Sequence, residues 1–105
     1  MISRWADYVI TGVQYDHSGE QRRIAAVEVR MDLGGKTGAS EVWRREQVLN
    51  AIRLDHETFV TSIMGTNGLW SRGKHVTLIR VNGIEYVRSD RRLVAQDDLG
   101  GVAEF

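Results

Sequence analysis

The stretch that decides the fold is "VTLIRVNGIEYVRSD", residues 76–90, in which two alternating runs flank the dipeptide Asn82-Gly83. Asn and Gly tolerate the positive φ of a two-residue type I′ turn, and such a turn fixes the register of a hairpin. Val81 is therefore predicted to lie opposite Ile84. The pairs that follow from this register are Arg80 with Glu85, Ile79 with Tyr86, and Leu78 with Val87.

The two faces of this hairpin differ in their residues because side chains alternate along a strand. The face expected to look into the core holds Thr77, Ile79, Val81, Ile84, Tyr86 and Arg88. The other face holds Val76, Leu78, Arg80, Glu85, Val87 and Ser89. Both faces are apolar away from the turn, which favours a central hairpin that is covered by a helix or curled into a partial barrel.

Residue periodicity predicts the elements before the hairpin. A β-branched and aromatic run predicts a first strand over 8–15, and period-two alternation predicts a second strand over 23–33, antiparallel to the first. The glycine-rich residues 34–40 are expected to form a mobile connection. Helical spacing of apolar residues predicts one amphipathic helix over 43–55. A third strand over 59–64 and a turn "GTNG" at 65–68 would then lead into a fourth strand over 69–81 and a fifth over 84–90.

These elements predict an α+β fold with the order β-β-α-β-β-β. We expect a small antiparallel sheet or partial barrel with the amphipathic helix packed on it. A chain of 105 residues is expected to be a single domain, 1–105, with a flexible N-terminus at 1–7 and an extended C-terminal tail at 97–105.

Composition excludes several classes of function. Fourteen basic and fourteen acidic residues cancel, so no global field attracts nucleic acid or an anionic membrane. The chain has no cysteine, which excludes disulfides and thiolate nucleophiles. No apolar run approaches the about 18 to 20 residues of a membrane span, and "MISRWADY" lacks the apolar core of a signal peptide. We expect a cytoplasmic protein that does not bind membranes.

The order of short motifs resembles a known family. The helix "REQVLNAIR", the segment "ETFVTS", the strand pair "KHVTLIRVNGIEYVRSD" and the close "DDLGGVAEF" are similar to the bacterial and phage family called domain of unknown function 3892. The resemblance covers about residues 8–105 and implies a similar fold. It departs at Trp43-Arg44, at Asp55-His56, at Asp98 and at Val102-Ala103. The family has no established activity that the resemblance could carry over.

No motif assembles catalytic groups, a cofactor site or a metal site. The histidines, His17, His56 and His75, lack metal-ligand spacing, and no serine has a nucleophile-elbow context. "GGKT" at 34–37 lacks the spaced glycine of a phosphate loop. Asp97 and Asp98 could act as paired carboxylates, but adjacent residues on an extended segment point apart, and a solvated or helix-capping turn is favoured.

A basic cluster with one indole flanks the last two strands. Its members are Trp70, Arg72, Lys74, Arg88, Arg91 and Arg92. Such side chains could track a phosphate backbone while the indole stacks on a base. The alternative is that Trp70 is a core residue and that the arginines pair with nearby acids, namely Asp90, Asp97, Asp98 and Glu104.

The favoured function is a small non-enzymatic binding module that acts through a protein-interaction surface, because Arg and Trp are frequent at interface hot spots. One version is a phage or mobile-element regulatory or anti-defence inhibitor. The alternative is a nucleic-acid-binding protein that uses the basic cluster. A homodimer is expected if the first strand lies at a sheet edge, since residues 8–15 carry no charge or proline to block edge pairing.

Overall fold

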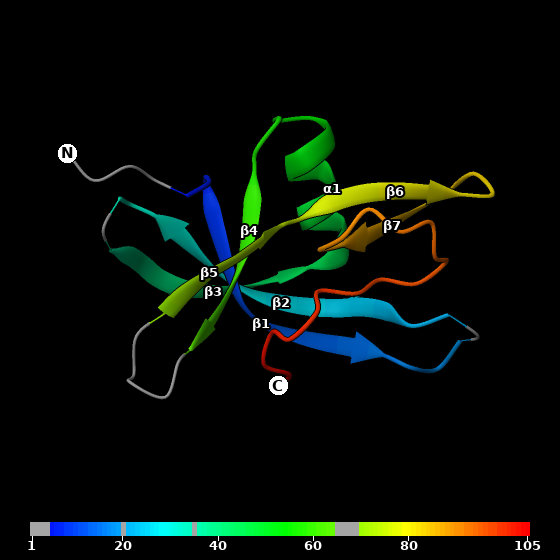
Figure 1. Ribbon diagram of the computed structural model, residues 1–105, viewed down its shortest axis with the longest axis horizontal. Coiled ribbons are helices and arrows are strands. Elements are labelled where there is room, and N and C mark those ends of the chain that lie inside the picture. Colours follow the sequence, from blue (N-terminus) through cyan, green and yellow to red (C-terminus); the bar gives the residue numbers. More distant parts are fainter. Residues whose placement is uncertain (1–4, 20, 35, 65–69) are drawn as a thin grey trace.

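The computed structural model describes residues 5–19, 21–34, 36–64 and 70–105 (Figure 1). Residues 1–4 and the predicted turn at 65–68 lie outside the described residues. The described elements are β1 (Tyr8–Asp16), β2 (Arg23–Asp32), β3 (Thr37–Arg44), α1 (Arg45–Arg53), β4 (Phe59–Met64), β5 (Trp70–His75), β6 (Thr77–Val81) and β7 (Ile84–Arg88). The predicted α+β class is confirmed.

The main sheet is mixed and has the strand order β3-β2-β1-β4-β5. Its neighbours pair antiparallel except β1 and β4, which run parallel with Tyr8 opposite Phe59 and Ile10 opposite Thr61. A parallel pair needs a long crossover, and β2, β3 and α1 lie in the chain between the two strands. The condition for the expected homodimer, an edge position for the first strand, is not met, because β1 is the central strand of the sheet. The expected dimer through β1 therefore loses its basis.

The segment 34–44 differs most from its prediction. Thr37–Arg44 is a strand, β3, where a mobile connection and the start of a helix were expected. The helix begins only at Arg45, and the Gln47 side chain accepts a hydrogen bond from the Arg44 N–H at 2.9 Å. Trp43 therefore belongs to β3 and packs against the core from there.

The predicted hairpin register is confirmed, with Val81 opposite Ile84 and Leu78 opposite Val87. Asn82 and Gly83 have φ angles of 52° and 80°, as a type I′ turn requires. The predicted fourth strand is divided at Val76 into β5 and β6, which belong to different sheets. The hairpin β6–β7 therefore forms a second layer instead of extending the main sheet.

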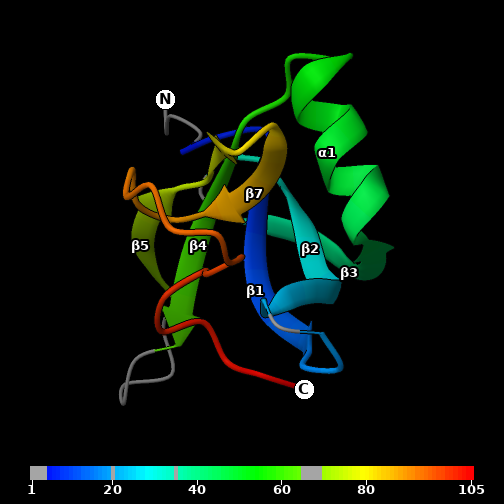
Figure 2. The same cartoon turned by 90° about the vertical axis from the view of Figure 1, so that its right-hand side faces the viewer.

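The core lies between the main sheet, α1, the hairpin and the C-terminal segment. Its largest cluster joins Ile10, Val13, Ile24, Val27, Val29, Val48, Leu49, Ala51, Phe59, Val76, Val87, Leu99 and Val102. The expected helix packing is confirmed, and α1 runs alongside β2 and β3 (Figure 2). Val76 and Val87 reach this cluster from the hairpin face that was not expected to be the core face, while Tyr86 and Arg88 are buried on the other.

Trp5, the first described residue, and the C-terminal segment are both attached to the main sheet. The N–H of Trp5 donates to Asp32 Oδ2 at 2.7 Å, and the Asp32 N–H donates to the Asp7 carbonyl. At the other end, Val13 bridges in parallel to Glu104. The described residues hold no helix that has the length and apolar character to cross a bilayer.

Candidate functional site

The predicted basic cluster is divided between three places. Arg72 and Lys74 are exposed on β5, an edge strand, and Arg72 Nη2 lies 3.0 Å from His75 Nε2. Trp70 begins β5, but its side chain lies outside what the structure describes. Arg91 and Arg92 are exposed on the loop after β7.

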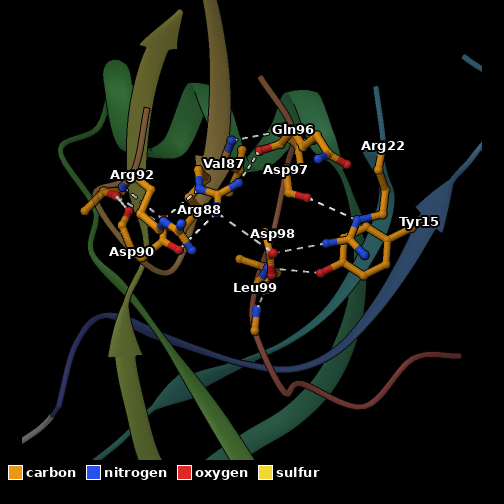
Figure 3. Close-up of polar contacts among 12 residues, drawn as sticks. Tyr15, Arg22, Val87, Arg88, Asp90, Arg92, Gln96, Asp97, Asp98 and Leu99 are labelled. Carbon is orange, nitrogen blue, oxygen red and sulfur yellow. Dashed lines mark hydrogen bonds and ion pairs between the residues drawn. The ribbon is translucent and has the colours of Figure 1, made fainter. Parts of the chain in front are cut away.

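Arg88, a member of the predicted basic cluster, does not belong to an exposed patch, because its side chain is only 4 % exposed. Its Nε and Nη2 donate to the two oxygens of Asp90 at 2.6 and 3.0 Å, and Nη1 donates to the Gln96 carbonyl at 2.9 Å (Figure 3). This guanidinium lowers the pKa of Asp90 to about 2. For Arg88 the alternative interpretation of the sequence holds, in which the arginine pairs with a nearby acidic residue.

Asp97 is fully buried and holds three elements together. It accepts hydrogen bonds from the Ile24 N–H at 2.7 Å and the Val87 N–H at 2.8 Å. Arg45, at the start of α1, donates to both of its oxygens at 2.7 and 3.1 Å. The prediction of a solvated turn is wrong for Asp97, which is buried. Both of its carboxylate oxygens accept hydrogen bonds within the domain, so its role is structural. Asp98 points elsewhere, toward Arg22 at 3.2 Å (Figure 3).

The feature that sequence reasoning missed is the outer edge of β3. β3 pairs only with β2 among the described strands, and residues 39–42 are all exposed. Val42 is 64 % exposed. This eight-residue strand holds no proline or lysine, and its charged residues are Glu41 and Arg44; proline and charged residues are the usual means by which an edge is protected from pairing. Alternate backbone N–H and C=O groups of an edge strand point away from its sheet and can accept another strand.

A row of aromatic rings lies beside this edge on the core-facing side of the sheet. The Tyr8 ring centroid is 4.9 Å from that of Trp43, with the planes tilted by 59°, and 5.2 Å from that of Phe59. Phe59 is buried, whereas Tyr8 and Trp43 are only partly buried. The row therefore ends in two rings that reach solvent next to β3.

The negative charges of several carboxylates act on the Tyr8 hydroxyl. Partial burial raises the pKa of Tyr8, and the negative charges of Glu57, Glu41, Asp7 and Asp55 raise it further. Partial burial also raises the pKa of Glu57, and the charges of Asp55 and Asp7 add to this effect, although a hydrogen bond with Tyr8 opposes it. These carboxylates place negative charge near the Tyr8 ring, which contacts the Trp43 ring of β3.

The rest of the described chain offers weaker candidates for a ligand pocket or a metal site. A hollow of about 210 Å³ at the turn after β1 is lined by Asp16, Ser18, Gly19, Gln21 and Arg23. This volume is below the about 300 Å³ at which ligand pockets usually begin. Among the described residues, no three His, Asp or Glu side chains gather in a group able to hold a metal ion.

No protein-family model, curated protein or solved structure matches this chain. The resemblance to domain of unknown function 3892 therefore stays a prediction.

Proposed function

We propose that this chain is a small non-enzymatic module of the cytoplasm that holds a partner protein at the outer edge of β3. The observation that carries the proposal is the exposure of residues 39–42 on a strand that pairs with only one of the other described strands. A regulatory or anti-defence inhibitor from a phage or mobile element is one version, suggested by the family resemblance.

An open edge favours this function because a partner strand satisfies backbone groups that are already aligned. The scaffold holds the edge in place: β3 pairs with β2 from Thr37 to Arg44, and Trp43 anchors it to the core. A partner would therefore bind a preformed template, which lowers the ordering cost of association.

Site-specific photo-crosslinking tests the proposal. A photoreactive amino acid at position Val42 should capture a discrete partner protein in the native host. The matched control is position Leu93, which is 76 % exposed on the loop after β7. Equal capture from both positions, or capture from Leu93 alone, would contradict binding at the β3 edge.

A second candidate, nucleic-acid binding, is favoured by the exposed cations Arg72 and Lys74 on the opposite edge, β5. If these side chains contact phosphates, the double change Arg72→Ala and Lys74→Ala should reduce the salt slope of oligonucleotide binding by about 2. Arg91→Ala with Arg92→Ala removes the same charge from the loop after β7 and serves as the control. Failure of the unmodified protein to retain DNA or RNA at low salt would eliminate this candidate.

A further inference from the structure

We propose that the partner segment at the β3 edge is an extended basic peptide, with a Lys or Arg side chain over the Trp43 and Tyr8 rings and beside Glu41. This inference rests on the proposed function and specifies the chemistry of the partner. It is carried by the open strand, by two partly exposed rings and by the sign of the surrounding charge.

The strand register places the recognition groups on one face. Glu41 lies opposite Val29 and Trp43 lies opposite Val27, and paired residues of antiparallel strands share a face. Both valines are fully buried in the core cluster, so Glu41 and Trp43 stand on the core-facing side, at its rim. Tyr8 reaches the Trp43 ring across β2. A side chain of an added strand on this face would meet the ring edge and the carboxylate together.

The rings give a cation a specific contact. A Lys or Arg head group within about 6 Å of a Trp or Tyr centroid is attracted by the ring quadrupole. The attraction is stronger where a carboxylate lies nearby, and the charges of Glu41 and Glu57 both act on the Tyr8 hydroxyl. The site therefore combines apolar contact for the side-chain stem with negative charge for its tip.

Neither Arg53 nor Arg44 cancels this charge. Arg53, at the end of α1, donates to Glu85 Oε1 at 2.6 Å and so faces the hairpin. Arg44 follows Trp43 on the strand, and alternation directs its side chain to the opposite face of the sheet. Asp7 is fixed by the Thr58 N–H at 2.8 Å, so its charge is held close to Tyr8.

This charge distribution also selects between partners. A phosphate backbone would be repelled from the rim, whereas a basic strand would be attracted. The β5 strand of a second copy carries Arg72 and Lys74 and is the competing occupant. The proposal commits to a basic segment of another protein, so assembly of the chain with itself through β5 would overturn it.

The test uses labelled peptides of about eight residues, the length of β3. One peptide alternates Lys with Thr, a second replaces every Lys by Glu, and a third carries N-methyl groups on alternate amides of the Lys peptide. Fluorescence anisotropy with the full chain should show binding of the first peptide alone. N-methylation should abolish binding because it removes the backbone donors that extend the sheet.

Charge reversal on the protein provides the matched variants. Glu41→Lys should weaken binding of the Lys peptide by about tenfold or more, because it places like charges together. Glu104→Lys makes the same change of net charge at an exposed residue that bridges to Val13 near the C-terminus, and should leave the affinity within about twofold. Circular dichroism of each variant establishes that it is folded, and peptide-induced protection of β3 amides from hydrogen exchange localises the contact.

The outcomes separate the inference from the proposed function. Equal binding of the Lys and Glu peptides, or equal weakening by both charge reversals, would overturn the basic specificity. If position Val42 captures a partner while the Lys peptide does not bind, the edge function stands and the basic segment is wrong. If the chain assembles by light scattering and Arg72→Glu abolishes the assembly, the occupant is a second copy and the inference is overturned.

Discussion

Arg45 Nε lies 2.7 Å from Asp97 Oδ2, although the two residues are 52 positions apart in the chain. The Asp97 carboxylate is fully buried, and the Arg45 side chain is 14 % exposed. The same guanidinium donates to the Glu85 carbonyl at 2.6 Å. The pair therefore links the start of α1 to both the hairpin and the C-terminal segment.

Removal of the Asp97 carboxylate should destabilise the domain strongly. Asp97→Ala leaves the mostly buried Arg45 guanidinium without its carboxylate and the N–H groups of Ile24 and Val87 without their acceptor. Breaking a buried pair from one side costs about 3 to 5 kcal/mol of unfolding free energy. Urea denaturation measures the loss. Asp98→Ala is the matched control: its partly exposed carboxylate should contribute no more than about 1 kcal/mol.

The role of Asp97 could not be predicted from the sequence, because its partners are distant. They come from Ile24, Arg45 and Val87, and no local pattern relates these positions to Asp97. The hairpin register could be predicted for the opposite reason. It depends on Asn82-Gly83, whose backbone preference is local and sufficient to align both strands.

The exposure of β3 makes its edge a candidate site, and it also prevented the strand from being predicted from the sequence. An edge strand with mostly exposed residues buries few side chains, so β3 shows no apolar alternation, and Trp43 alone joins the core cluster from it. The three glycines at 34–38 favoured a loop in the prediction. The parallel pairing of β1 with β4 was also beyond local reasoning, because it depends on the crossover.

Gly73 should be intolerant of a side chain. A Cβ at this position would overlap Thr61 Oγ1 and lie 2.7 Å from the Thr61 carbonyl oxygen, where the register of β4 and β5 shifts. Gly73→Ala should therefore displace β5 and lower the unfolding free energy by about 1 to 3 kcal/mol. Gly38→Ala, whose Cβ would make an ordinary 3.6 Å contact with Met31, should cost nothing. Similar denaturation midpoints for the two variants would contradict the close approach.

The Arg88–Asp90 pair predicts how stability responds to acid. The folded pKa of Asp90, about 2, lies below its ordinary value because Arg88 donates to the carboxylate. A lowered folded pKa means that the contribution of Asp90 is complete above about pH 4 and is lost as pH falls toward 2. Carbon NMR of the Asp90 carboxyl should give a midpoint near 2. In Arg88→Lys, which removes the planar two-pronged donor, the midpoint should move up toward about 3.9.

The hairpin turn gives the last prediction. Gly83 has φ of 80°, and a Cβ there would meet no atom within 4 Å, so the cost of a substitution comes from backbone strain alone. Gly83→Val should lower the unfolding free energy by about 1 to 3 kcal/mol, since a β-branched residue disfavours positive φ. Asn82→Gly, at a φ of 52°, places the most permissive residue in the same turn and should preserve the hairpin. Arg91→Ala with Arg92→Ala, outside the strands, should change stability by no more than about 0.5 kcal/mol. A wild-type denaturation midpoint for Gly83→Val would mean that the turn is not type I′, and the register of β6 and β7 would have to be assigned again.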